Sequence, residues 1–211
     1  MKPSNQRTGV SAKRPVIHRI EGLHPFKTIS YLIISIACLL YAFISFLFIK
    51  HLAFELNGNF SFYLPKFFTI SAILLICSVY FTSRVLSAFK NDEIPHLRKL
   101  LSYTLVLGLL FFISQSIAWM ELLTMDVNIV NSKITTFVFT FSAIHLSFVL
   151  VSMIMSGILF YRYMLIESDP VKTLIATTDP LEKIKLEINK VLWHFNVISW
   201  TMIFLMFLFV F

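Results

Sequence analysis

Five long stretches of this 211-residue chain contain no Asp, Glu, Lys or Arg, and each is long enough to cross a lipid bilayer. They run over residues 28–49, 67–83, 100–120, 134–161 and 191–211. A hydrocarbon core of about 30 Å needs about 20 residues of helix, and a charge at its centre costs roughly 2.5 to 3.5 kcal/mol on insertion scales. The sequence therefore predicts an all-α, polytopic transmembrane bundle of five membrane-spanning helices.

We expect this bundle to account for almost the whole chain. The predicted membrane domain covers residues 28–211, with spans at about 28–49, 67–89, 97–120, 134–163 and 190–211. Five such helices leave no room for a separate soluble domain. Residues 1–27 carry three prolines and little apolar periodicity, and we expect them to form a basic, loosely ordered cytoplasmic arm.

The 18 basic residues are distributed unevenly over the predicted connections. The arm, the second connection and the fourth connection hold 15 of them, whereas the other side of the membrane holds Lys50, Lys66 and Lys133. Short cytoplasmic loops of membrane proteins are enriched in Lys and Arg. This bias predicts a cytoplasmic amino terminus and an external carboxyl terminus. It also explains the net charge of +7 without a nucleic-acid partner.

Prolines mark the ends of several predicted helices. Pro65 suits the first turn of the second helix, and Pro170 follows the end of the fourth. In the last connection Asp179, Pro180 and Glu182 have the pattern of an N-cap, a first-turn proline and a capping-box acid. We expect this helix to begin at the cytoplasmic interface and to continue into the fifth span.

The predicted spans contain few strongly polar side chains, and these are the first candidates for a functional site. They are Gln115 in the third span, His145 in the fourth, and His194 with Asn196 in the fifth. Ser142, Ser152 and Ser156 stand at offsets of −3, +7 and +11 from the histidine of the fourth span, so the four side chains share one helical face. We expect this polar seam to make hydrogen bonds between helices, and a ligand-binding role is the less favoured alternative.

Two histidines inside the membrane suggest a haem site, but their depths argue against it. At 1.5 Å per residue, His145 lies roughly 24 Å from the inner end of its span and His194 about 5 Å, whereas two nitrogens on one metal lie within roughly 4 Å of each other. Cys38 and Cys77 lie within spans and read as small packing residues. No carboxylate relay, catalytic triad or phosphate-binding loop occurs in the sequence. We predict no metal, no haem and no catalytic residue in this chain.

Two stripes of aromatic and polar residues also stand out at helical spacing. The stripes are Gly108, Phe112, Gln115 and Trp119 in the third span, and Trp193, Asn196 and Trp200 in the fifth. Trp119 and Trp193 fall near opposite membrane interfaces, where amphipathic rings are favoured. Interfacial anchoring is therefore a sufficient explanation for these two residues taken alone.

Taken together and in order, these residues resemble subunit III of the haem-copper cytochrome c oxidases in its five-helix bacterial form. The resemblance covers residues 31–211 and is most specific at Trp193-His194-Phe195-Asn196 with the later Trp200, which is similar to the family's aromatic-Trp-His-Phe-Val-Asp and following Trp. The second match is LGLLFFISQ at residues 107–115 followed by Trp119, similar to a Gly-x-x-Phe-x-x-x-Gln run that ends in Trp. Further matches are Leu64-Pro65, Ser71, Ser78 and Ala88 with the basic loop after it.

The chain departs from the family at three polar positions. Where the family commonly has a glutamate after a serine, this chain has Ser35-Ile36. The family's fourth helix carries two histidines around a Gly-rich turn, and here only His145 remains, with Ser142 near the place of the other. Asn196 replaces the aspartate of the family's last helix. The resemblance therefore describes a divergent member whose polar sites are neutral.

This resemblance implies a non-catalytic accessory subunit of a terminal oxidase in the aerobic respiratory chain of a bacterial inner membrane. It implies that the haems and copper belong to partner chains, the catalytic subunit I and the copper-bearing subunit II, with a larger supercomplex as a further expectation. It also implies bound phospholipid, because family members hold lipid between helix groups, help oxygen reach the catalytic subunit and preserve it over many turnovers. The residues expected to set helix packing and lipid contacts are Gln115, Trp119, Ser142, His145, Trp193, His194, Asn196 and Trp200.

Two other interpretations stay open at this point. The related accessory subunit of nitric oxide reductases fits the same sequence features, because the gas chemistry occurs in another chain. A stand-alone small permease or membrane scaffold requires a polar pathway through the bundle. The candidate for that pathway is the seam around His145, which lacks a charged partner in the sequence.

Overall fold

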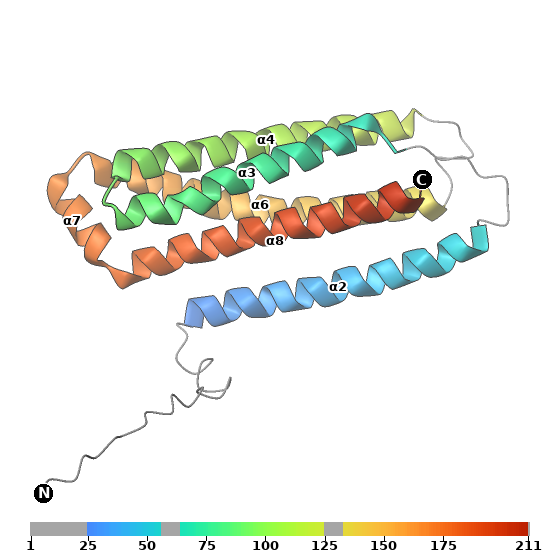
Figure 1. The fold of residues 1–211 in the computed structure, drawn as a ribbon, viewed down its shortest axis with the longest axis horizontal. Coiled ribbons are helices and arrows are strands. Elements are labelled where there is room, and N and C mark those ends of the chain that lie inside the picture. Colours follow the sequence, from blue (N-terminus) through green and yellow to red (C-terminus); the bar gives the residue numbers. More distant parts are fainter. Residues whose placement is uncertain (1–24, 56–63, 125–132, 211) are drawn as a thin grey trace, which may run out of the picture.

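The computed structural model describes residues 25–55, 64–124 and 133–210. Five helices in it are long and apolar enough to cross a membrane: α2 (Pro25–Glu55), α3 (Lys66–Lys90), α4 (Ile94–Leu123), α6 (Lys133–Glu167) and α8 (Pro180–Val210). A short helix, α7 (Pro170–Thr178), joins α6 to α8 at one end of the bundle (Figure 1). The described segments contain no strand. The predicted all-α, multi-pass membrane architecture is confirmed.

The connections follow the local sequence signals with small shifts. Pro65 is the N-cap residue of α3 rather than a residue of its first turn, and Pro95 occupies the first turn of α4. Between α3 and α4 the chain turns through Asp92, whose φ of 58° lies in the left-handed region that Asp tolerates better than most residues. The Glu93 amide donates to the Ala88 carbonyl over 2.9 Å, which closes a tight antiparallel hairpin.

Four of the long helices form the main body, and α2 lies beside it. Helix α3 packs against α4 and α8, α4 packs against α6, and α6 packs against α8. Helix α2 contacts α6 and α8 (Figure 1), and most of its described side chains are exposed. The first predicted span is therefore the least enclosed of the five.

Aromatic side chains fill much of the interior. Phe48 of α2 is fully buried and meets Phe137, Phe141 and Phe207 with ring centroids 5.6, 6.2 and 5.9 Å away in edge-on geometry, an arrangement that aromatic pairs prefer. A second apolar cluster gathers at the α7 end and includes Leu97, Leu101, Leu159, Tyr163 and Leu186. Large apolar residues also cover the outer surface, as expected where lipid rather than water is the solvent.

Two sequence-based expectations need correction here. Residues 1–24 of the predicted arm lie outside the described residues, but 25–27 belong to α2 rather than to an arm. Cys38 and Cys77, interpreted above as small packing residues, are exposed on the bundle surface, so packing within this chain does not account for them. Period alone did not separate the lipid-facing side of these strongly apolar helices from the inner side.

Candidate functional site: a polar seam between α6 and α8

The predicted polar face of α6 is buried along its whole length. Ser142, His145, Ser152 and Ser156 are each at most 1% exposed, which confirms that their spacing places them on one inward face. Their partners come chiefly from α8, which runs antiparallel to α6 (Figure 1). We call this line of buried polar groups between α6 and α8, together with the α4 groups bonded to it, the polar seam.

Amide and indole groups of α8 hold the serines of α6. Asn196 donates from Nδ2 to Ser152 Oγ over 2.7 Å, and Trp193 donates from Nε1 to Ser156 Oγ over 2.8 Å. Ser156 in turn donates to Asn189 Oδ1 over 2.8 Å. A buried polar group is costly unless it is hydrogen-bonded. These bonds therefore fix the register of α6 against α8.

His145 lies where four helices meet. Its Nδ1 is 3.4 Å from Tyr41 Oη of α2 and 3.4 Å from Ser199 Oγ of α8. Its ring stacks on Trp200 with centroids 4.8 Å apart and an interplanar angle of 26°, and Phe111 of α4 meets its edge. The imidazole is fully buried. His145 thus acts as a packing centre for α2, α4, α6 and α8.

Helix α4 joins the seam through Trp119 and binds α3 through Gln115. Trp119 donates from Nε1 to Ser142 Oγ over 2.9 Å, and Gln115 donates from Nε2 to Ser71 Oγ of α3 over 3.0 Å. Gly108 lets α4 approach the other helices closely, because a Cβ there would stand 2.9 Å from Met153 Sδ and 3.1 Å from Trp193 Cη2. A larger residue at this position would crowd the Met153 side chain first and the Trp193 indole next.

The tryptophans have a different role from the one that their sequence positions suggest. Trp193 is fully buried and Trp200 is 1% exposed, whereas Trp119 is half-buried. Trp193 and Trp119 both donate their N–H groups to serines of α6. Interfacial anchoring is therefore wrong as an explanation for Trp193, which is a buried hydrogen-bonding residue of the bundle interior.

His194 lies outside the seam. Its Nδ1 is 2.8 Å from the Lys190 carbonyl oxygen and its Nε2 is 3.2 Å from Ser83 Oγ of α3. Since a carbonyl only accepts, Nδ1 donates to Lys190, and Nε2 pairs with the Ser83 hydroxyl. The two membrane histidines therefore belong to separate clusters. Among residues 25–55, 64–124 and 133–210, no group of three or more His, Cys, Asp or Glu is placed to hold a metal.

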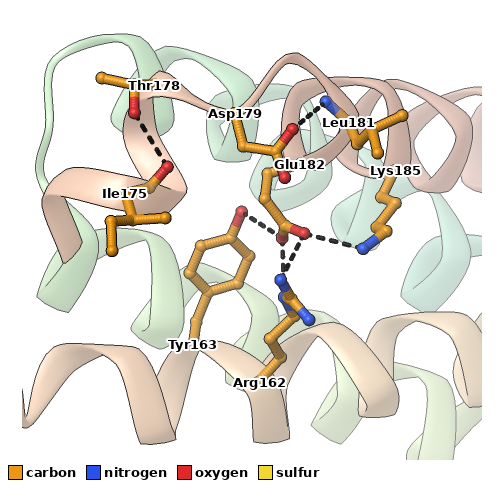
Figure 2. Close-up of polar contacts among 8 residues, drawn as sticks. All are labelled: Arg162, Tyr163, Ile175, Thr178, Asp179, Leu181, Glu182 and Lys185. Carbon is orange, nitrogen blue, oxygen red and sulfur yellow. Dashed lines mark hydrogen bonds and ion pairs between the residues drawn. The ribbon is translucent and has the colours of Figure 1, made fainter. Parts of the chain in front are cut away.

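A charged cluster that the sequence analysis missed extends the α6–α8 interface toward α7. Glu182 is fully buried and binds Arg162 through Nε at 3.0 Å and Nη2 at 2.8 Å. Lys185 Nζ lies 2.7 Å from Glu182 Oε1, and the Tyr163 hydroxyl donates to Oε2 over 3.4 Å. Figure 2 shows the three side chains converging on the Glu182 carboxylate. We call Arg162, Tyr163, Glu182 and Lys185 the Glu182 cluster.

This cluster corrects the predicted start of α8. The Asp179 carboxylate accepts from the Leu181 amide over 2.8 Å (Figure 2), as an N-cap residue does. The capping-box role of Glu182 is wrong, because its carboxylate points to Arg162 and Lys185 instead of back to the helix start. Pro170 follows the end of α6, as predicted, and is also the first residue of α7.

Asp169 caps the short helix at the end of α6. Its carboxylate accepts from the Val171 amide over 2.9 Å and from the Lys172 amide over 3.4 Å. These two amides hold the pKa of the Asp169 carboxyl below its usual range. The cap fixes α7 across the end of the bundle, where it connects the two helices of the seam.

The arrangement supplies hydrogen bonds between packed helices. The seam consists of hydroxyl, amide, indole and imidazole groups that bond to one another across helices. A comparison with protein-family models and one with curated proteins both find no match for this chain. Its function must therefore be inferred from its own residues.

Proposed function

We propose that this chain is a non-catalytic accessory subunit of a haem-copper terminal oxidase, in the place of subunit III, in a bacterial inner membrane. The proposal takes the haems and copper to be in partner subunits I and II, and the amino terminus to face the cytoplasm. The basic loops support that orientation. This chain would stabilise the catalytic subunit and hold lipid beside it.

One observation carries the proposal: the two segments on which the family resemblance rests meet through side chains in the bundle interior. Gly108, from the third-span motif, faces the Trp193 indole of the fifth-span motif. Three residues further along α4, Phe111 meets Trp200 edge-on with ring centroids 5.8 Å apart. Motifs that are 85 residues apart in the chain thus form one contact, which is what a shared structural role requires.

The chemistry of the interior supports an accessory role. Polar groups in a membrane interior are usually kept either for helix association or for moving ions and protons. In the seam the hydrogen bonds run from helix to helix, and the imidazole of His145 is enclosed by Trp200, Phe111 and Tyr41. Such groups hold helices in register and leave electron transfer to partner chains.

The direct test is the composition of the complex that contains this chain. The chain is tagged in its native host, extracted in a mild detergent and purified, and the reduced-minus-oxidised haem spectrum and oxygen uptake of the product are measured. We expect haem absorbance and oxygen uptake in the same fraction. Recovery of the chain free of any haem protein would refute the proposal. Reduction of nitric oxide without oxygen uptake would instead identify the chain as an accessory subunit of a nitric oxide reductase.

A pair of glycine variants connects this test to the structure. Gly108→Val crowds Met153 of α6 and Trp193 of α8 and should lower the haem recovered with the tagged chain. Gly157→Val is the matched control, because an added Cβ there meets nothing within 4 Å. Equal haem recovery with both variants would remove the motif contact as support for the proposal.

A further inference from the structure

A groove with a volume of about 280 Å³ lies between α2 and α8. Its walls include Tyr41 and Ala42 of α2 and Phe195, Ser199, Met202 and Met206 of α8. Tyr41 is close to the midpoint of α2 (Pro25–Glu55), so the groove lies near the centre of a bilayer that this helix crosses. Pockets for small ligands begin at about 300 Å³, and this groove therefore suits a single ring.

The apolar walls of this groove favour a flat ring over an acyl chain. Met202 and Met206 bring thioether sulfurs to the groove, and Phe195 brings an aromatic ring. Sulfur makes favourable contacts with the edge of an unsaturated ring, and two rings attract each other in edge-to-face or offset geometry. A saturated acyl chain gains neither interaction.

Two of the groove's hydroxyl groups compete for one nitrogen atom. His145 Nδ1 lies 3.4 Å from the Tyr41 hydroxyl and 3.4 Å from the Ser199 hydroxyl, and both distances are longer than an ordinary hydrogen bond of about 2.7–3.2 Å. An imidazole nitrogen has one proton or one lone pair in the ring plane, so it serves one hydroxyl at a time. Ser199 donates its own proton to the Asn196 carbonyl over 3.1 Å. The Tyr41 hydroxyl is therefore the donor that can turn to a ligand in the groove.

Depth in the membrane narrows the chemical class of that ligand. Phospholipid headgroups lie about 15 Å from the bilayer centre, so their phosphate and ester groups do not reach a phenol near the midpoint of α2. A molecule that accepts a hydrogen bond at this depth must be neutral and mostly hydrocarbon, because a charge there is costly. A quinone with an apolar tail meets these requirements, since its ring is flat and uncharged and its polar atoms are carbonyl acceptors.

We propose that this groove binds one neutral, membrane-soluble quinone, with the ring between α2 and α8 and a ring carbonyl accepting a hydrogen bond from the Tyr41 hydroxyl. Met202, Met206 and Phe195 surround the ring, and the apolar tail extends into the lipid. The inference is of binding alone and includes no electron transfer to this chain. It rests on contacts within the chain and does not depend on the proposed respiratory role.

Native mass spectrometry of the full chain in a neutral detergent tests the site. The chain is given equal amounts of decylubiquinone, decylbenzene and dioleoyl phosphatidylcholine, and the retained molecules are quantified. Decylbenzene has the same tail on a ring without carbonyl groups. We expect one decylubiquinone per chain in preference to both other probes. Tyr41→Phe should weaken decylubiquinone binding about fivefold, the factor that corresponds to about 1 kcal/mol for one hydrogen bond inside a membrane, and should leave decylbenzene binding unchanged.

Two further variants separate a specific site from general partition into the detergent. Tyr31→Phe makes the same change on an exposed ring of α2 that does not line the groove, and it should leave the preference unchanged. Ala42→Phe fills the groove from an exposed position of α2 while it keeps the Tyr41 hydroxyl, and it should displace decylubiquinone. The unfolding midpoint of each variant in the same detergent shows whether the fold is intact.

Four results would overturn the inference. Equal retention of decylubiquinone and decylbenzene would show that the carbonyl groups are not recognised. Retention of phosphatidylcholine in place of decylubiquinone would show that the groove takes an acyl chain. Equal effects of Tyr41→Phe and Tyr31→Phe would show that the Tyr41 hydroxyl is not the donor. Undiminished decylubiquinone binding by a folded Ala42→Phe chain would place the quinone elsewhere.

Discussion

The α6–α8 interface buries polar groups in two ways, and the difference follows depth in the membrane. Its middle part, from His145 to Ser156, uses neutral groups that bond to α8. Its α7 end buries the Glu182 carboxylate, but there Arg162 and Lys185 remain partly exposed. A buried charge is tolerated where its counter-ions can reach the membrane surface. Deeper in the membrane, where counter-ions cannot do so, buried polar groups pair through neutral hydrogen bonds.

Removing the buried indole of Trp193 from the seam should have the greatest effect on stability. Trp193→Ala leaves a cavity between α4, α6 and α8 and removes the bond to Ser156, and we expect a loss of about 3–5 kcal/mol in the free energy of unfolding. Equilibrium unfolding in mixed micelles measures this loss. Trp119→Ala, at a half-buried indole, is the control and should cost less. Equal losses in the two variants would mean that the difference in burial between the two indoles does not determine their contributions to stability.

The Glu182 cluster should be more sensitive to loss of one partner than to loss of both. Arg162→Met leaves the buried carboxylate with Lys185 and Tyr163, and we expect a loss of about 2–3 kcal/mol, below the value for a fully buried pair because Arg162 is partly exposed. The double variant Arg162→Met with Glu182→Met should recover part of this loss, as unfolding in the same micelles will report. A double variant less stable than the single one would contradict the account.

A single neutral hydrogen bond in the seam should matter less. Asn196→Leu removes the bond to Ser152 while keeping a side chain of similar volume, and interhelical bonds in membranes contribute about 0.6–1.7 kcal/mol. Ser147→Ala is the control, because Ser147 is exposed and bonds to the Ala143 carbonyl of its own helix. If Asn196→Leu cost more than Arg162→Met, the contrast between the two parts of the interface would be reversed.

The smallest effect concerns the Asp169 cap, and it depends on pH. The folded-state pKa of Asp169 lies below its ordinary value of 3.8, so its contribution to stability is complete above that value and is lost as the pH falls through the folded-state pKa. Hydrogen exchange at the Val171 and Lys172 amides should therefore be slowed at pH 6. This protection should fall as the pH drops through the folded-state pKa of Asp169. Asp169→Ala should remove this pH dependence. If the variant protects the two amides as well as the parent chain does, the Asp169 carboxylate does not cap them.

The bundle could be predicted because its signals are local. A long stretch without charged residues identifies a membrane span, and the helical period alone places the serines around His145 on one face. The same rule applied toward the start of α8 would have found more, because Glu182, Leu186 and Asn189 continue the spacing of Trp193 and Asn196, and all five side chains are buried.

The rest of the site depends on which helices become neighbours. Glu182 fits a capping box by local pattern, and its observed place depends on Arg162, which is 20 residues earlier in the chain. Tyr41 reaches His145 across 104 residues, and no period within either helix indicates that contact. Tertiary packing overrides the local pattern at Glu182, and it creates the Tyr41 contact, which no local propensity indicates. The Asp-Pro pattern that starts α8 also starts α7, at Asp169 and Pro170. The start of α7 could therefore have been predicted from the sequence.

The central claim, that this chain supports an oxidase without carrying its chemistry, is tested most directly by removing the chain. The host complex is purified with and without it, and the haem spectrum, the initial rate of oxygen uptake and the loss of activity during sustained turnover are measured on equal amounts of haem. We predict the same spectrum and a similar initial rate, with faster inactivation in the complex that lacks the chain. Loss of a haem or copper signal together with the chain, or an unchanged lifetime during turnover, would contradict the account.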